Sequence, residues 1–139
     1  MRLGYYRDLE AWKEAHHLVL AVYRLSSGFP RDERFGLTAQ VRKAVVSVTS
    51  NLAEGAGRRT DPWMLTFVGY AMGSLQEVDS QLLVAKDLGF APPGSFGDVE
   101  QRVGTVGRLI SGLRASLERS SGKGPKRAPR PDPGSTTDQ

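Results

Sequence analysis

QVRKAVVSVTSNLAEGAGR, residues 40–58, decides the fold, because it carries two stripes at helical spacing. The apolar stripe consists of Val41, Ala44, Val45, Val48 and Leu52. The polar stripe has short side chains at its centre and consists of Gln40, Lys43, Ser47, Asn51, Glu54 and Arg58. Residues three and four apart share one side of a helix. The stretch therefore predicts a core-facing helix over 35–55, with a polar seam packed against another element.

A second helix is predicted over residues 8–26, and it has two apolar seams. One seam consists of Leu9, Trp12, His16, Val19 and Tyr23. The other consists of Ala11, Ala15, Leu18, Val22 and Leu25. The seams lie about 110° apart, so the apolar arc covers about half of the helix. That arc is wider than packing against one partner requires.

A third helix is predicted over residues 61–88, with Asp61 as its N-cap, Pro62 as its first residue and Gly89 as its stop. Its core seam consists of Met64, Val68, Ala71, Leu75, Val78, Leu82 and Ala85. A mixed aromatic and polar seam lies beside it and consists of Trp63, Phe67, Tyr70, Ser74, Glu77 and Gln81. At the end of the 35–55 helix, Gly55 and Gly57 are expected to form the C-terminal cap.

A fourth helix is predicted from about residue 98, with a heptad pattern that continues to residue 117. Gly104, Gly107 and Gly112 each cost about 1 kcal/mol there relative to alanine. They either permit close backbone approach or leave this helix loosely packed. Short loops between long helices favour antiparallel neighbours. The sequence thus predicts an all-α, antiparallel up-down four-helix bundle over residues 1–118.

Residues 119–139 are predicted to form a disordered basic tail, because they are rich in Pro and Gly and bury little apolar surface. The tail carries five basic and two acidic residues, whereas residues 1–118 carry fourteen basic and thirteen acidic residues. The predicted bundle is thus nearly neutral, which weakens any prediction of a strongly basic binding surface.

The chain has no cysteine, which excludes a disulfide framework, a thiol nucleophile and a zinc-thiolate site. The first residues lack the apolar core of a signal peptide, and no run approaches the roughly 20 apolar residues of a membrane span. We therefore expect a cytoplasmic protein that does not bind membranes.

Several local patterns together carry a family resemblance. They are Phe29-Pro30 with Glu33, Phe35-Gly36-Leu37-Thr38 with Gln40, then Arg42, Ser47, Asn51, Ala53-Glu54-Gly55 with Arg58, and Gly73-Ser74-Leu75 with Glu77. From about residue 5 to 117, the chain closely resembles the four-helix-bundle family of bacterial proteins encoded in intervening sequences of large-subunit rRNA genes. Its relatives include the accessory variability determinant of diversity-generating retroelements.

The resemblance implies an antiparallel four-helix bundle that assembles as a homopentamer and has a non-enzymatic role. In the retroelement relative, the implied role is to bind nucleic acid and a reverse transcriptase. This chain departs from that relative in its near-neutral predicted bundle, its glycine-containing fourth helix and its Pro-rich tail. The first of these differences argues against nucleic-acid binding.

The polar seam is predicted to consist of Gln40, Ser47, Asn51, Glu54, Ser74 and Glu77. Glu54 and Glu77 could form a catalytic carboxylate pair, but we favour acceptance of hydrogen bonds from Arg42, Arg58, Ser47 or Asn51. If Glu54 belongs to a buried seam, Glu54→Ala should cost about 1–3 kcal/mol. His16 and His17 point about 100° apart on a helix, so they are not expected to chelate one metal ion. We predict no catalytic residue, metal site or cofactor.

Candidate nucleic-acid-binding residues form two sets. Arg42, Lys43, Arg58 and Arg59 make the best basic patch of the predicted bundle, and Arg58 and Arg59 precede a helix N-terminus that favours anions. The tail contributes Lys123, Lys126, Arg127 and Arg130. The alternative for both sets is ordinary solvated charge. The Gly55–Thr60 stretch lacks the lysine spacing of a phosphate loop, so a helix cap is the better interpretation.

These observations favour a non-enzymatic oligomeric accessory protein that binds RNA or DNA and a nucleic-acid-processing partner, for which the resemblance suggests a reverse transcriptase. The alternative is a protein–protein adaptor without nucleic-acid affinity, and an enzyme is a distant third. Self-association into a closed ring is expected because the predicted helices have more apolar surface than one small bundle can bury. The number of five subunits comes from the resemblance.

Overall fold

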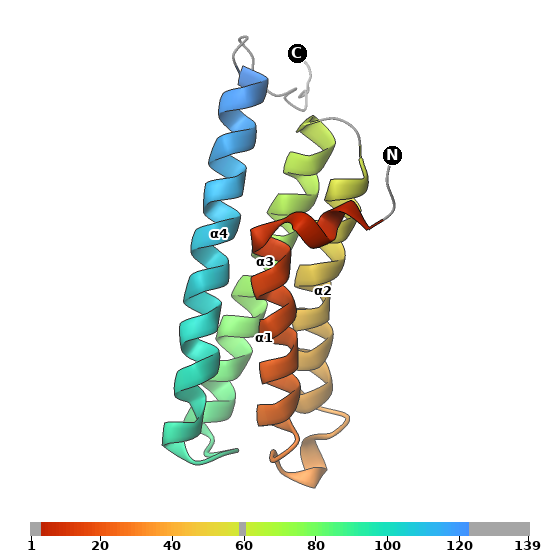
Figure 1. The fold of residues 1–139 in the computed structure, drawn as a ribbon. Helices are drawn as coiled ribbons and strands as arrows, with labels where there is room; N and C mark the ends of the chain where they lie inside the picture. Colours follow the sequence, from red (N-terminus) through yellow and green to blue (C-terminus); the bar gives the residue numbers. More distant parts are fainter. Residues whose placement is uncertain (1–3, 59–60, 123–139) are drawn as a thin grey trace, which may run out of the picture.

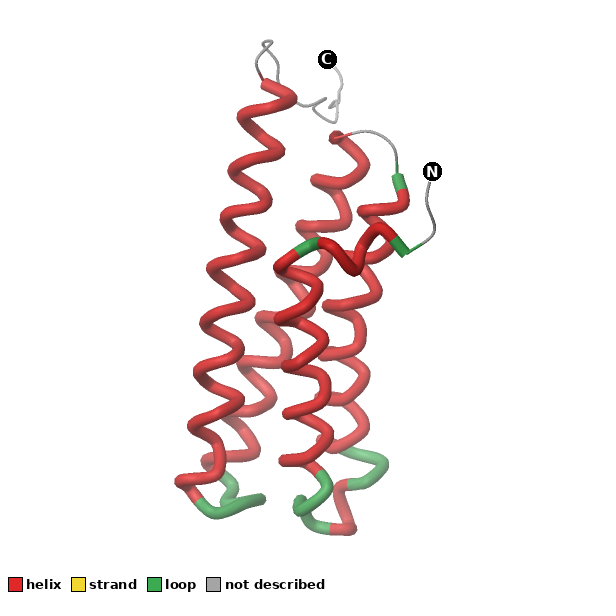
Figure 2. Tube along the Cα trace, in the orientation of Figure 1, coloured by secondary structure: helices red, strands yellow, loops and turns green. Residues whose placement is uncertain are grey.

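Four long helices make up the fold in the computed structural model, which describes residues 4–58 and 61–122 (Figure 1). They are α1 (Glu10–Ser26), α2 (Leu37–Gly57), α3 (Asp61–Asp87) and α4 (Gly97–Gly122). Three short 3-10 helices accompany them: η1 (Tyr5–Asp8), η2 (Arg31–Glu33) and η3 (Pro93–Phe96). Consecutive long helices run in opposite directions, and the described residues contain no strand (Figure 2). The predicted all-α four-helix bundle is confirmed.

The core lies where the predicted apolar stripes of the four helices meet. The α2 residues Val41, Val45, Val48 and Leu52 are fully buried, as the sequence predicted. In α1, the seam that contains Ala15 and Leu18 faces the core. The other α1 seam is divided: Leu9, Trp12 and Val19 are half-buried and pack against the core, whereas His16 and Tyr23 are exposed. His16 therefore lies outside the core, although the sequence placed it in an apolar seam.

The start of α2 is fixed by the loop before it. The Leu37 backbone N–H donates to Glu33 Oε1 at 2.9 Å, so the Glu33 side chain satisfies a free donor of the first turn. Gly36 leaves room for that carboxylate, since a Cβ there would lie 2.7 Å from Glu33 Oε1. The helix consequently begins at Leu37, two residues later than predicted.

The end of α2 differs from the prediction in the role of Gly55. This glycine is buried within the helix, which continues to Gly57, and Arg58 follows in an extended conformation. A Cβ at Gly55 would lie 2.9 Å from Met64 Sδ and 3.0 Å from Phe67 Cβ. Gly55 therefore permits the close approach of α2 and α3, and the predicted glycine cap is wrong.

The end of α3 follows the predicted stop. Gly89 has a φ of 73°, the left-handed conformation that favours glycine after a helix. The Gly89 N–H donates to the Lys86 carbonyl at 3.1 Å, and the Phe90 N–H donates to the Ala85 carbonyl at 3.0 Å. This pair of bonds is the Schellman motif, and Phe90 then packs against Phe29 with ring centroids 5.7 Å apart.

The end of α4 lies beyond the predicted boundary of the bundle. The helix continues to Gly122, so residues 119–122 belong to it rather than to the tail. Ser120 Oγ donates to Asp61 Oδ2 at 2.9 Å and joins the last turns of α4 to the first turn of α3. The first proline after Leu117 is Pro125, which explains why the helix is not interrupted earlier. The remaining predicted tail, residues 123–139, lies outside the described residues. None of the described helices combines the length and the apolar character needed to span a membrane.

Candidate interaction surfaces

Three members of the predicted polar seam meet between α2 and α3. The hydroxyl groups of Ser47 and Ser74 lie 2.8 Å apart and share a hydrogen bond. Asn51 Nδ2 donates to the Ser47 carbonyl at 2.9 Å and to Ser47 Oγ at 3.1 Å. All three side chains are half-buried. The small side chains thus form a satisfied polar bridge that fixes the register of the two helices.

The other three members do not join this bridge. Glu54 accepts a hydrogen bond from Arg58 Nη2 at 2.8 Å, but the two side chains are 51% and 42% exposed. Gln40 and Glu77 are exposed, and within residues 4–58 and 61–122 neither side chain has a hydrogen bond or an ion pair. Glu54 is therefore paired with Arg58, the residue that follows α2, as the hydrogen-bonding interpretation allowed, and no contact links it to Glu77.

An aromatic cluster lies where the end of α2 meets the first turns of α3. It consists of Arg58, Trp63, Phe67 and Tyr70. The Arg58 guanidinium carbon lies 5.1 Å from the Trp63 ring centroid and 5.2 Å from that of Phe67. Phe67 also packs edge-on against Tyr70 at 5.5 Å. Trp63 is 53% exposed and Tyr70 is 57% exposed. The three aromatic members of the predicted mixed seam thus form a contiguous apolar surface with one stacked cation.

The four bundle residues proposed as a basic patch are not brought together. Arg42 faces α1, where its Nε donates to Ser26 Oγ at 2.8 Å and its Nη2 donates to the Tyr23 carbonyl at 3.2 Å. Arg58 follows the last residue of α2 in an extended conformation, sixteen residues after Arg42, so about four helical turns separate the two residues. Lys43 is exposed. Arg59 lies outside the described residues, as do Lys123, Lys126, Arg127 and Arg130.

The two histidines are both exposed and point to different neighbours. His16 stacks on Trp12, with ring centroids 4.9 Å apart and an interplanar angle of 15°. His17 Nδ1 lies 3.8 Å from Glu14 Oε1. The aromatic stack of Trp12 continues edge-on to Tyr6 in η1, at 4.9 Å. These contacts secure η1 and the first turns of α1 against each other.

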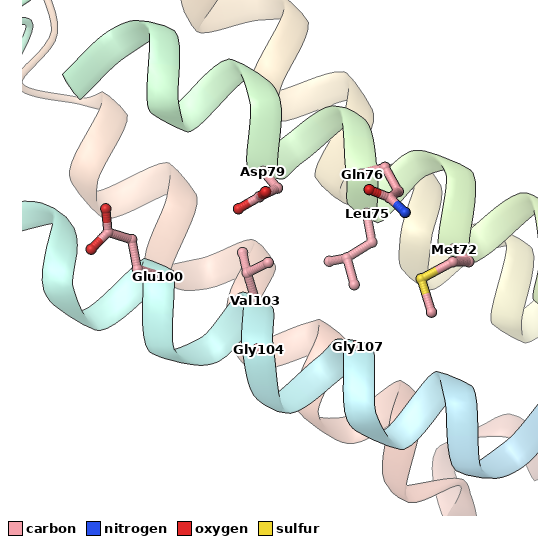
Figure 3. Close-up of a pocket in the computed structure, with 8 residues that line it drawn as sticks. All are labelled: Met72, Leu75, Gln76, Asp79, Glu100, Val103, Gly104 and Gly107. Carbon is pink, nitrogen blue, oxygen red and sulfur yellow. The ribbon is translucent and has the colours of Figure 1, made fainter. Parts of the chain in front are cut away.

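An open cavity of about 350 Å³ lies between α3 and α4 (Figure 3). It is lined by Met72, Leu75, Gln76, Asp79, Glu100, Val103, Gly104 and Gly107. A Cβ at Gly107 would lie 3.6 Å from Leu75 Cδ2, which is an ordinary contact. The α4 glycines therefore leave space rather than permit a close backbone approach. The two glycines were the sequence signal for this cavity, but the spacing did not show which helix they face.

Comparison with known proteins identifies a family for this chain. No curated protein matches the chain. Residues 7–112 match the family model described as the 23S rRNA-intervening sequence protein, well over half of the chain. The match includes α1, α2, α3 and most of α4, together with the polar bridge and the aromatic cluster. The chain belongs to the 23S rRNA-intervening sequence protein family.

Proposed function

We propose that this protein is a non-enzymatic, cytoplasmic accessory protein that works as a closed ring of its own copies, five in number by family resemblance. The observation that carries the proposal is the exposed apolar surface on more than one side of the bundle. Ten large apolar side chains of the described residues are exposed. Tyr23 and Val46 belong to α1 and α2, and Trp63 and Tyr70 belong to the aromatic cluster.

Burial of this surface supplies the driving force for association. Each large apolar side chain that leaves water stabilises the assembled state by about 1.5–3 kcal/mol. Isolated apolar residues are ordinary on protein surfaces, but contiguous aromatic groups mark contact sites. A ring of more than two copies requires two different surfaces on each copy, which agrees with apolar groups on separate faces.

Light scattering and tryptophan quenching test self-association together. The chain has two tryptophans, and the Trp12→Phe variant keeps only Trp63 as a probe. We expect a mass of several chains at micromolar concentration, with acrylamide quenching of Trp63 that increases on dilution. A stable monomer of 15.1 kDa at micromolar concentration would contradict the proposal. An assembly in which Trp63 quenching is independent of concentration would exclude the aromatic cluster from the subunit contacts.

The partner is better described as a protein than as nucleic acid. The described residues contain thirteen basic and thirteen acidic side chains, so the bundle has no net charge to attract phosphates. Arg42 is engaged with α1 and Arg58 is paired with Glu54, so among the described members of the predicted basic patch only Lys43 has no side-chain partner. These features support an adaptor that binds proteins, and a reverse transcriptase remains the partner suggested by the retroelement relative.

Nucleic-acid binding is the second candidate, and the positive charge of the C-terminal residues favours it. Several copies of Lys123, Lys126, Arg127 and Arg130 in one ring would bind phosphates with an avidity above that of one chain. We expect such binding to be independent of nucleotide sequence and steeply reduced by salt. Two variants decide at low salt: a chain ending at Gly122, and the full chain with Lys43→Gln and Arg58→Gln. If only the chain ending at Gly122 loses RNA retention, the tail binds the RNA. If the intact protein does not retain RNA, the function as a protein–protein adaptor is the one that remains.

A further inference from the structure

Phe35 is the most exposed large apolar side chain among the described residues, at 86%. It lies between η2 and α2, and its ring is contacted by the Arg34 guanidinium, whose carbon lies 5.1 Å from the ring centroid. We call Arg34 and Phe35 the knob. An apolar ring held fully in water forfeits the free energy that burial would give it, so its position needs an explanation.

The turn that carries the knob is ordered by its own hydrogen bonds. The Arg34 N–H donates to the Arg31 carbonyl at 3.1 Å, and the Gly36 N–H donates to the Glu33 carbonyl at 2.9 Å. The Glu33 carboxylate also accepts the Leu37 N–H and ties the turn to α2. Because the backbone is already fixed, docking of Phe35 would cost less conformational entropy than docking of a free loop.

The α3–α4 cavity is concave where the knob projects, and its rim carries the carboxylates of Asp79 and Glu100 where the knob carries the Arg34 guanidinium. Met72, Leu75 and Val103 supply apolar surface, while Gly104 and Gly107 contribute no side chains (Figure 3). Its volume of about 350 Å³ suits one aromatic ring with part of a neighbouring side chain, rather than a whole helix. The cavity thus offers a recess for a single projecting residue, with apolar side chains beside the polar Gln76, Asp79 and Glu100.

Charge distinguishes the two carboxylates of the rim. Glu100 is paired with Lys86, whose Nζ lies 2.9 Å from Glu100 Oε2. The Asp79 carboxylate has no hydrogen bond or ion pair within the described part of the chain. The Arg34 guanidinium likewise has no ion pair among those residues, so the knob brings the charge that Asp79 lacks.

The knob and the cavity lie on opposite sides of one bundle. Phe35 is in the connection between α1 and α2, a segment that lies across the bundle from α3 and α4 (Figure 1). The cavity lies between α3 and α4, about 10 Å along α4 from its first residue. A chain is therefore unable to fill its own cavity, but a neighbouring copy at nearly the same height can. Contacts between two different surfaces of identical subunits are the kind that close rings.

We propose that the Arg34–Phe35 knob of one copy docks in the α3–α4 cavity of the next copy, with Arg34 opposite Asp79. This contact rests on the self-association proposed above. It arranges the copies head to tail, since each copy uses its knob on one neighbour and its cavity on the other. Phe35 would displace water from the cavity. Gly104 and Gly107 have no side chains, so they leave the space that the Phe35 ring would fill.

A mixing experiment tests the head-to-tail contact. Phe35→Ser removes the knob and keeps the cavity, while Gly104→Leu fills the cavity and keeps the knob. A Cβ at Gly104 makes only an ordinary contact with Arg108 Nη1, at 3.5 Å, so a side chain can start there without a clash. We expect each variant alone to have the mass of one chain, and an equal mixture to form a complex of two chains. Gly112→Leu is the matched control at an exposed position of the same helix and should keep the wild-type mass.

A charge exchange gives a second readout that does not depend on Phe35. Arg34→Asp should dissociate the assembly at low salt, and Asp79→Arg in the same chain should restore it. Circular dichroism identifies any variant that fails to fold. If Phe35→Ser or Gly104→Leu fails to fold, the charge exchange between Arg34 and Asp79 tests the contact instead. If the wild type assembles and neither the mixture nor the exchange behaves as described, the knob contact is overturned while self-association stands. If the wild type is a monomer, the proposed function itself fails.

Discussion

Gly55 shows how one missing side chain positions two helices. It lies in α2 against Met64 and Phe67 of α3, at a point where any Cβ would be closer than real contacts allow. The same region carries the exposed aromatic cluster, since Phe67 packs between Trp63 and Tyr70. The close approach at Gly55 therefore determines both the α2–α3 packing and the presentation of the aromatic surface.

We predict that Gly55→Ala lowers the free energy of unfolding by about 1–3 kcal/mol, as overpacking of a tight contact does. The control is Gly57→Ala in the same helix, where a Cβ meets nothing within 4 Å and stability should be unchanged or slightly higher. Thermal and denaturant unfolding at equal protomer concentration measures the difference. Equal stability of the two variants would mean that the helices separate easily at this point.

Ser47 and Glu54 differ in how much each stabilises the fold, although the sequence placed both in one seam. Ser47→Ala removes the partner of Ser74 and an acceptor of Asn51, so we predict a loss of about 1–2 kcal/mol. Glu54→Ala removes an exposed ion pair with Arg58 and should cost less than about 1 kcal/mol. This revises the 1–3 kcal/mol expected for a buried seam. Denaturant unfolding of both variants measures the difference. If Glu54→Ala were the more destabilised, the assignment of Ser47 to the polar bridge and of Glu54 to an exposed ion pair would be wrong.

At the scale of elements, Arg42 connects α2 to the end of α1. Its guanidinium donates to Ser26 Oγ and to the Tyr23 carbonyl, and it lies over the Tyr23 ring at 4.5 Å. The Tyr23 carbonyl belongs to the last turn of α1, where a cation is favourable. Arg42 is therefore a structural contact between two helices, which makes it a poor choice for a phosphate ligand.

We predict that Arg42→Lys lowers the free energy of unfolding by about 1–2 kcal/mol, because a lysine is unable to make both hydrogen bonds and stack on Tyr23. Its neighbour Lys43 is exposed, so Lys43→Gln should change stability by less than about 0.5 kcal/mol. Chemical denaturation compares the two single variants with the wild type. A destabilised Lys43→Gln variant beside an unaffected Arg42→Lys variant would reverse the roles assigned to these residues.

At the scale of the whole molecule, the ends of the bundle are joined by contacts between distant parts of the chain. Ser120 in the last turns of α4 bonds Asp61 in the first turn of α3, and η1 packs against α1 through Tyr6 and Trp12. The folded unit therefore extends to Gly122. This matters for any experiment that separates the bundle from the tail.

We predict that a chain ending at Gly122 unfolds at the same temperature as the full chain. A chain ending at Glu118 should lose about 1 kcal/mol, because it lacks the Ser120–Asp61 hydrogen bond and the last turn of α4. Differential scanning calorimetry of both chains at one protomer concentration measures this. If the shorter chain matched the longer one, residues 119–122 would contribute nothing to the folded unit.

The sequence alone determined the elements of this protein. Helical spacing is a local property, set by residues three and four apart, so the four helices and their core stripes were predictable from the chain itself. Val48 and Leu52 were placed in the core correctly, and Gly89 was correctly identified as the stop of α3 because left-handed backbone favours glycine. The helix ends were off by a few residues, because side chains such as Glu33 and Ser120 act on them through contacts that spacing does not reveal.

Only the tertiary structure decided which side of each helix meets which neighbour. Arg42 reaches back sixteen residues to Ser26, and Ser47 meets Ser74 twenty-seven residues later. Such pairs depend on the packing of whole helices, so no local pattern identifies them. The same reason explains why Gly55 was taken for a cap, why the α3–α4 cavity was not foreseen and why Phe35 gave no sign of its exposure. Burial is a property of the assembled bundle, and a helical stripe shows only that a residue has a side on which it can be buried.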